Sequence, residues 1–304
     1  MVATAAHTSP VRGFHEGELL VQRRSGVDAE AHRLERMLDL PDLSGGAERF
    51  LADRTFAVLT GRGADGRLWT SPLRGPAGFL QGSGRTLRIA TTPVEGDPLH
   101  GIAVGEQVAL VAIEFAARRR VRVNGRLSAV GPDELVVDVD QAYGNCPQYI
   151  SRRSFGPLGP TGVEPRPVEV GTALSDGDRV LISSADTFFL GTAHPDRGAD
   201  SSHRGGPRGF VTTDGAQLWW PDLPGNNMFN SLGNLAVDPA ASLLFVDWTD
   251  GSVLALSGTA EVEWHDAASA DDTGRRVRFT TEAVVRRRDP ALRAEDVARD
   301  GELS

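Results

Sequence analysis

The sequence contains two copies of one pattern. Residues 75–80 read GPAGFL, and residues 206–211, which come 131 positions later, read GPRGFV. The correspondence continues from residues 123–125 (VNG) to residues 256–258 (LSG), with a drift that one or two small gaps absorb. Solenoid repeats have about 20–50 residues, so a period this long is the length of a small domain. The sequence therefore predicts a duplicated domain whose two copies pack as an internal pseudo-dimer, with a shared site between them.

The composition is that of a globular protein, with 304 residues of which 40% are hydrophobic and 24% charged. A net charge of −9 argues against a nucleic-acid partner, because phosphate backbones select clustered basic surface. All 32 basic residues are Arg, which excludes Schiff-base chemistry by a lysine, and the single Cys146 excludes an intramolecular disulfide. With no signal-peptide core and no bilayer-length apolar run, we expect a soluble, cytoplasmic protein without a membrane partner.

Hydrophobic periodicity divides the chain. Helical spacing predicts helices over Asp28–Leu40 and Gly46–Leu51, and six short strands between Phe56 and Val130 predict a small barrel. A further helix is expected over Glu134–Tyr149. The strands expected after it are Val180–Ser183, Thr187–Thr192, Gly209–Thr213, Gln217–Trp220, Ser242–Trp248 and Val253–Trp264. The predicted divisions are an N-terminal extension (1–46), a first barrel with its following helix (47–153), a Gly/Pro-rich linker (154–173), a second barrel (174–290) and a charged tail (291–304).

The second half carries the clearer chemical signal. In residues 200–211, hydroxyls and arginines alternate with glycines that let a ligand approach the backbone closely. A strand and a turn then lead into a short helix within residues 221–235, where free amides, with Asn226 and Asn227 alongside, suit an anion. Both features indicate a phosphate-binding site.

This order of elements resembles the pyridoxamine 5′-phosphate oxidase-like family of split barrels that bind flavin mononucleotide (FMN). The resemblance implies a mainly β fold with flanking helices, built from two FMN-binding-type split barrels in tandem. It places Arg204 and Arg208 on the strand that binds the flavin phosphate, and Asn226, Asn227 and Ser231 at the start of the short helix, where the family enzyme has basic residues. The site residues that we predict are Ser202, Arg204, Gly205, Arg208, Val211, Trp220, Pro221, Asn226, Asn227, Ser231, Asn145 and Arg153, with His203 as the catalytic residue and no metal ligand.

The first half matches this pattern more loosely. Residues 73–75 (LRG) occupy the place of residues 203–206, and its short-helix region, residues 95–100, is acidic and lacks the asparagines. Family barrels bind two flavins at a dimer interface. A tandem chain is therefore expected to keep one well-formed site, in the second half, and one decayed site.

Several residues have two interpretations. Residues 118–120 (RRR) with Arg122 either contact a phosphate or reduced nicotinamide, or form a solvated hairpin turn, which we favour. His203 either bonds the flavin and donates a proton, or packs in the interior. Only one of Trp219 and Trp220 can face the site, because side chains alternate along a strand. His15 lies beside two carboxylates but has no second histidine at ligand spacing in the sequence, so we expect it to be structural or part of a lid.

The function that this pattern predicts is an FMN-dependent oxidoreductase that moves hydride or electrons between flavin and a small organic substrate or NAD(P)H. One alternative is a barrel that binds flavin or haem without turnover, and haem or a deazaflavin are the alternative cofactors. Another is an interaction protein that has lost its ligand. A homodimer is possible.

Overall fold

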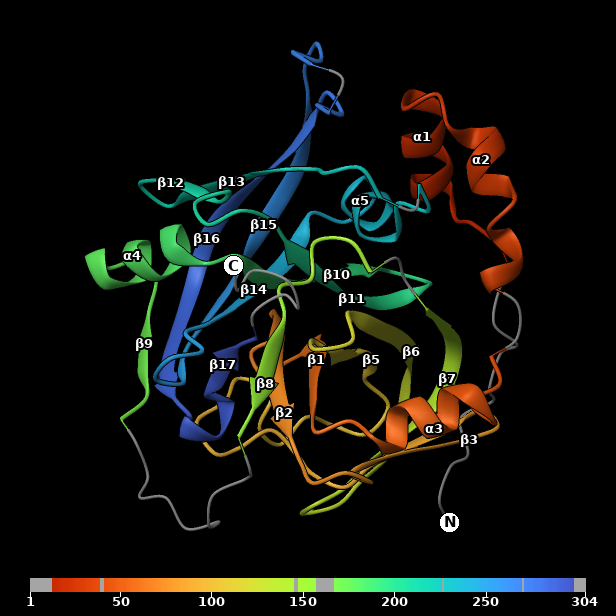
Figure 1. The fold of residues 1–304 in the computed structure, drawn as a ribbon, viewed down its shortest axis with the longest axis vertical. Coiled ribbons are helices and arrows are strands. Elements are labelled where there is room, and N and C mark those ends of the chain that lie inside the picture. The colour runs from red at the N-terminus through yellow and green to blue at the C-terminus, as the bar shows by residue number, and fades with distance from the viewer. Residues whose placement is uncertain are drawn as a thin grey trace, which may run out of the picture.

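The computed structural model describes residues 13–38, 41–144, 147–156, 167–225, 227–269 and 271–297. It is a mainly β protein in which two antiparallel sheets of equivalent design lie against each other (Figure 1).

The first barrel is a seven-stranded sheet in the order β2-β1-β5-β6-β7-β4-β3. Its side chains enclose one apolar core that includes Leu59, Trp69 and Leu110. Five of the six strands expected between Phe56 and Val130 are present, and the third, expected over Gly78–Leu80, begins only at Leu80. The strands are β1 (Phe56–Arg62), β2 (Leu68–Arg74), β3 (Leu80–Ser83), β4 (Thr86–Ile89), β5 (Gln107–Glu114), β6 (Arg119–Val130) and β7 (Leu135–Gly144).

The second barrel repeats this order as β11-β10-β14-β15-β16-β13-β12, with β9 paired to β16 at one side. Its core surrounds Phe188, Trp220 and Phe245. A two-stranded sheet of β8 (Arg153–Phe155) and β17 (Ala294–Asp296) lies apart from both barrels in the pairing pattern. The strands are β9 (Glu169–Gly171), β10 (Thr187–His194), β11 (Gly198–Gly205), β12 (Thr212–Asp214), β13 (Gln217–Pro221), β14 (Ala240–Val246), β15 (Ser252–Trp264) and β16 (Arg275–Arg288).

Register and irregularities confirm the duplication. Phe56 pairs with Arg74 in the first sheet, and Thr187 pairs with Gly205 at the equivalent place in the second. The long β6–β7 pair is bulged at Gly125, and β15–β16 is bulged at Gly258. At both glycines a Cβ would overlap a carbonyl oxygen of the neighbouring strand, which explains why each copy keeps a glycine there.

The two barrels share a core. Phe56, Ile113 and Phe115 of the first barrel pack in one cluster with Phe189 and Leu244 of the second. Beside this cluster, Thr70 hydrogen-bonds Ser242 across the interface at 2.6 Å between the hydroxyl oxygens. The predicted internal pseudo-dimer is therefore the observed arrangement.

Two expectations about elements are wrong. Residues 135–144 form strand β7 and not a helix, because Leu135, Val137 and Val139 alternate with partly exposed residues and face the first core. The residues of the expected strand Val180–Ser183 lie in helix α4 (Asp176–Ser184), because Ser175 caps its first turn and the Ser175 amide donates a hydrogen bond to the Asp178 carboxylate.

The other helices flank the barrels. The expected helix over Asp28–Leu40 is divided into α2 (Asp28–His32) and the 3₁₀ helix η1 (Glu35–Leu38), and α3 (Gly46–Ala52) is where it was predicted. Helix α1 (Glu16–Arg24) packs on α5 (Asn230–Leu235) beside the second barrel (Figure 1). Another 3₁₀ turn, η2 (Pro290–Leu292), precedes β17. No helix in the described part of the chain has the length and apolar character that crossing a bilayer requires.

Candidate functional site

A cavity of about 110 Å³ opens where the second barrel meets the first, and we call it the interbarrel cavity. Strand β11 provides residues 202–205 and strand β13 provides Trp220 and Pro221. The turn before α5 and the start of that helix close one side, and Arg120 and Arg122 reach in from β6 of the first barrel. The cavity is thus built from both halves, as the duplication predicted.

A buried network fixes the floor of this cavity. Arg122 donates from Nη1 to both carboxylate oxygens of Asp200, at 3.0 and 3.1 Å, and from Nη2 to Ser202 Oγ at 2.7 Å. Ser231 Oγ donates to Asp200 at 2.8 Å. Burial alone would lower the pKa of Arg122, but Asp200 and Tyr143 together raise it above its usual value. The first barrel therefore contributes a permanent cation to a site that is centred on the second.

Arg204 lies in a second buried ion-pair group. Its Nη1 is 3.5 Å from Asp222, whose other oxygen accepts a 2.9 Å hydrogen bond from Arg275 Nε. Burial lowers the pKa of Arg204, and Asp222 opposes that shift. Because Asp222 is shared with Arg275, Arg204 is only partly neutralised by it.

His203 is neutral in this structure. Arg120 Nη1 lies 2.8 Å from His203 Nδ1, and a guanidinium can only donate, so Nδ1 accepts and the ring proton is on Nε2. Burial first, and then the positive charges of Arg120, Arg153 and other arginines, holds the pKa of His203 well below its ordinary value. The imidazole is therefore suited to donate a hydrogen bond from Nε2.

Four buried nitrogen atoms on residues that line the cavity have no hydrogen-bond partner among the described residues. They are Arg122 Nε, Arg204 Nε, His203 Nε2 and Trp220 Nε1. All four are N–H donors in the states derived above. Buried donors are normally satisfied, so a group of them around one cavity indicates a ligand that presents oxygen atoms.

The sequence comparison agrees with this geometry. Residues 175–298 match the family model described as Pyridoxamine 5′-phosphate oxidase. The match spans the second barrel, which is therefore similar to this family. The resemblance seen in the sequence is thereby confirmed over that range, whereas no curated protein matches the chain.

Similar solved structures each cover less than half of the chain. HupZ of Group A Streptococcus is 12% identical over 36% of this chain and 90% of its own, with a TM-score of 0.29. A Clostridium acetobutylicum protein related to general stress protein 26 is 19% identical over 41% and 93%, with a TM-score of 0.29. A putative pyridoxamine 5′-phosphate oxidase of Corynebacterium glutamicum is 13% identical over 43% and 100%, with a TM-score of 0.27. Likeness this distant carries no argument about function.

Within this pyridoxamine 5′-phosphate oxidase-like barrel, most of the predicted site residues meet at the interbarrel cavity. Trp220, and not Trp219, is the tryptophan that faces it. Glycine is required at position 205 because a Cβ would overlap the Tyr149 carbonyl oxygen. The predicted residues that line the cavity are Ser202, His203, Arg204, Gly205, Trp220, Pro221, Asn227 and Ser231.

Three predicted residues lie elsewhere. Arg208 is on an exposed turn and pairs with Asp296 at 3.6 Å, and Val211 is in the second core. Arg153 is buried in an ion pair with Asp186 and lines a different cavity. Arg208 and Val211 were predicted because they are close in sequence to the flavin motif, and that closeness does not show which way a side chain points. Arg153 was predicted from the separate block that follows the first barrel. The remaining two, Asn145 and Asn226, lie outside the described residues, as does Cys146.

Two carboxylates that organise the site were not among the residues predicted from the sequence. Asp200 and Asp222 flank the predicted strand and turn, but nothing in their local sequence shows that each will pair with an arginine. The hairpin interpretation of the arginine run is also incomplete, since Arg120 and Arg122 line the cavity. The alternation of Arg120 and Arg122 on β6 was the available signal, because residues two apart share a face.

The equivalent place in the first half is closed. Ser71, at the position equivalent to Ser202, hydrogen-bonds Asp97, which also accepts a 3.0 Å hydrogen bond from Arg287 of β16. The side chains of Arg287 and Asp97 are 4% and 2% exposed. Leu73 stands where the second half has Arg204. A buried ion pair and an apolar side chain thus occupy this place in the first half.

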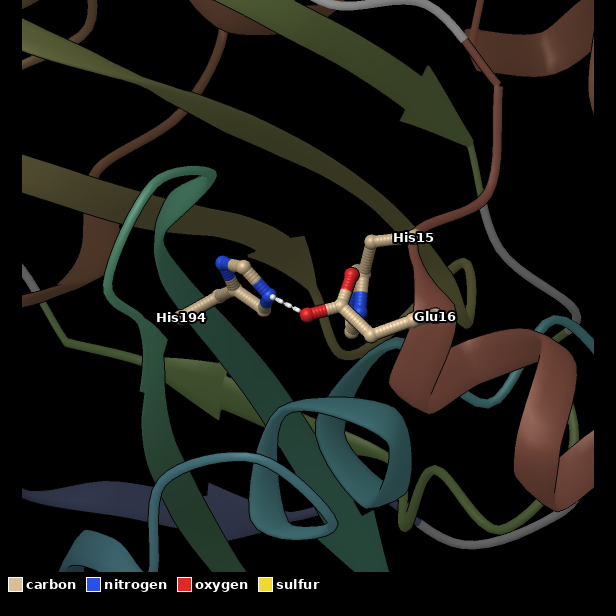
Figure 2. Close-up of side chains that lie close together, drawn as sticks. All are labelled: His15, Glu16 and His194. Carbon is tan, nitrogen blue, oxygen red and sulfur yellow. Dashed lines mark hydrogen bonds and ion pairs between the residues drawn. The ribbon is translucent and has the colours of Figure 1, made fainter.

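His15, Glu16 and His194 form a polar cluster where α1 meets the second barrel (Figure 2). The sequence has no second histidine at ligand spacing from His15, but the fold brings the centroid of the His194 ring to 4.4 Å from that of His15. His194 Nδ1 accepts hydrogen bonds from the backbone amides of residues 196 and 197, and its Nε2 contacts Glu16 at 3.1 Å.

The hydrogen bonds of this cluster are those of a docking contact. A histidine that binds a metal through Nε2 normally carries its proton on Nδ1 and donates it to an oxygen. His15 and His194 do the opposite, since both Nδ1 atoms accept backbone amides. The Nε2 proton of His194 therefore points to Glu16 and holds α1 against the barrel.

Proposed function

We propose that the interbarrel cavity binds the phosphate end of FMN and that the protein is an FMN-dependent oxidoreductase. The observation that carries this proposal is the group of buried donors without partners on Arg122, His203, Arg204 and Trp220. Phosphate oxygens accept from several N–H donors at once, and hydrogen bonds to a charged group are the strongest of their kind. The family of the second barrel supports a flavin as the molecule that bears the phosphate.

The size and charge of the cavity fit one end of the cofactor. A volume of about 110 Å³ is below the range of about 300–1,000 Å³ that encloses a whole ligand of this size. It suits a phosphate group, with the rest of the flavin extending outward. Three arginines and one aspartate line the cavity, so an anion is favoured.

The residues that line the cavity would have different roles in binding FMN. Arg204 and Arg122 would hold the phosphate with Ser202 and Ser231, which already lie in the same hydrogen-bond network. His203 would donate one hydrogen bond from Nε2 to the ligand. When bound, flavin supplies the hydride and electron chemistry, and the protein supplies binding and orientation.

Haem is less well suited to this cavity. An axial ligand must offer a nitrogen lone pair to iron, whereas His203 uses its lone pair on Nδ1 to accept from Arg120. A barrel that binds flavin without turnover has no structural observation in its favour, and the test below separates it from an enzyme.

The test is an absorbance spectrum of the purified protein, after incubation with FMN if it is colourless, followed by anaerobic NADPH or NADH and then air. We expect a flavin spectrum that bleaches with the nicotinamide and recovers in air. A deazaflavin or haem spectrum would show that the cofactor is that molecule and not FMN. Bound flavin that no nicotinamide reduces would favour a non-catalytic barrel, and a protein that binds none of these would contradict the proposal.

A further inference from the structure

A second cavity adjoins the interbarrel cavity, and we call it the outer cavity. It has a volume of about 540 Å³ and is lined by the β5–β6 turn, by residues 148–152, by the turn after β11 and by Val297. Gln148 and Tyr149 line both cavities. Gly205 belongs to the first cavity and Gly206 to the second, so the two are separated by little more than one backbone segment.

The charged side chains that line the outer cavity, among the described residues, are both positive. They are Arg118 and Arg152. This contrasts with the net charge of −9 for the chain, and with another cavity, of about 550 Å³, whose three arginines share the lining with Asp186, Asp247, Glu295 and Asp296. A cavity whose charged lining residues, within the described part of the chain, are both arginines is therefore a local exception on an acidic protein.

Backbone carbonyls hold the two arginines in place. Arg118 Nη2 donates to the Pro147 carbonyl at 3.0 Å, and Arg152 Nη1 donates to the Ala116 carbonyl. Arg118 of the β5–β6 turn thus bonds the segment that contains Arg152, and Arg152 bonds the β5–β6 turn. Among the described residues neither forms an ion pair with a carboxylate, and Arg118 Nε is buried without a hydrogen-bond partner. The charges are fixed in position but are not neutralised.

We propose that the outer cavity is an anion subsite that binds a phosphate or carboxylate group of the molecule that exchanges electrons with the flavin. This inference rests on the proposed function for the interbarrel cavity. A fixed pair of guanidinium groups suits oxyanions of either kind, because each group offers several donors in one plane. The shared wall of the two cavities would let one elongated molecule reach both.

The first experiment titrates inorganic pyrophosphate, and separately citrate, into the FMN-loaded protein by calorimetry. The variants are Arg118→Gln, Arg152→Gln and the double variant. We expect at least one of the two anions to bind and the double variant to lose at least tenfold in affinity, as removal of charge-assisted hydrogen bonds predicts. Tighter binding of pyrophosphate would identify a phosphate subsite, and tighter binding of citrate a carboxylate subsite.

Arg208→Gln is the matched control. It removes one exposed arginine that lines neither the interbarrel nor the outer cavity, so anion affinity should stay within twofold of the unaltered protein. The proposal is overturned if neither anion binds, if the double variant binds as the unaltered protein does, or if Arg208→Gln loses as much. Thermal midpoints of all variants show whether each remains folded.

The FMN titration of the same variants separates the two proposals. FMN affinity should fall in Arg204→Gln and stay unchanged in Arg118→Gln and Arg152→Gln, whereas the anion titration should show the reverse. A protein that binds no FMN refutes the proposed function through that titration alone. The dependence of anion binding on Arg118 and Arg152 is still measured on the protein as purified.

Discussion

At the scale of single residues, His15 and Glu18 have opposite pKa shifts at one helix start. Burial first, with His194 and Arg197 next, lowers the pKa of His15 from 6.5 to about 4. Burial raises the pKa of Glu18 from 4.5 to about 7, although the His15 amide and Asn230 partly oppose it. Both side chains are buried where α1 meets α5, so both shifts affect the stability of that contact.

The two shifts oppose each other between pH 4.5 and 6.5. In that range the folded chain holds the proton of Glu18 more tightly than the unfolded chain, so stability falls as pH rises. The unfolded chain holds the proton of His15 more tightly, so its contribution rises with pH. We therefore expect this pair to leave the free energy of unfolding nearly independent of pH in that window.

Removing one member should reveal the other. In Glu18→Gln the free energy of unfolding, relative to the unaltered protein, should rise with pH between 4.5 and 7 by up to about 1.4 kcal/mol per pH unit. In His15→Asn, which keeps a side chain that can cap the helix, the same difference should fall between pH 4 and 6.5. Urea unfolding across this range measures both. Parallel pH profiles for all three proteins would refute the assignment.

Residue-level prediction from the sequence was limited to one strand and one turn. Ser202, His203 and Arg204 were predictable because a family pattern covers them and they are consecutive on β11. Asp200 and Asp222 were not, because their roles depend on arginines that arrive from β6 and β16. Whether an arginine is a site residue or part of an internal ion pair is decided by its spatial partner.

At the scale of elements, the close crossing of α1 and α5 positions one wall of the interbarrel cavity. Gly17 and Gly233 face each other there, and Asn230, on the cavity side of α5, donates to Glu18 at 2.6 Å. Helix α1 precedes the range that matches the family model. The N-terminal extension therefore supports a site that lies mainly in the second barrel.

Gly233→Ala tests this crossing. Its Cβ would lie 2.6 Å from the Glu18 amide nitrogen and 2.7 Å from the Glu18 Cα, so α1 must move away. We expect a loss of about 1–3 kcal/mol in the free energy of unfolding, typical of overpacking, together with weaker FMN binding. Gly46→Ala, in helix α3, has no atom within 4 Å of the new Cβ and should cost nothing. Equal stability of the two variants would show that α1 does not press on α5.

Element prediction failed where local pattern and tertiary role differ. Residues 135–144 had length and polarity that suit a helix, but three buried apolar side chains at alternate positions made them a strand. Residues 180–183 had β-branched residues that suit a strand, but the Ser175 cap upstream made them helical. In both cases a signal for the correct element was present in the sequence and was outweighed by composition.

At the scale of the whole molecule, the shared core should make the two barrels unfold together. Phe56, Phe115 and Phe189 are buried in one cluster to which both halves contribute, so neither barrel keeps its apolar surface covered alone. We expect one calorimetric transition, with equal van't Hoff and calorimetric enthalpies. Two separate transitions would show that the halves are independent domains. The first transition would then disrupt the interbarrel cavity, because both barrels contribute residues to it.

The duplication was predictable from sequence because it leaves repeated glycine and proline positions, which are tied to backbone geometry. The loss of the equivalent site in the first half was predictable only in part. The loss of its asparagines can be read from residues 95–100, but the ion pair between Asp97 and Arg287 that closes it joins residues 190 positions apart. Long-range pairs of this kind leave no local signature.

The most direct test of the account compares FMN dissociation constants of the unaltered protein, Arg204→Ala and Arg74→Ala. Arg204 lines the open cavity, whereas Arg74 lies in the closed half and binds carbonyl oxygens of Thr55 and Ala291. We predict that Arg204→Ala weakens FMN binding by at least tenfold, since a charge-assisted contact is worth about 1.5–3 kcal/mol, and that Arg74→Ala leaves it unchanged. No change for Arg204→Ala, or an equal loss for Arg74→Ala, would contradict the claim that the second half carries the flavin site.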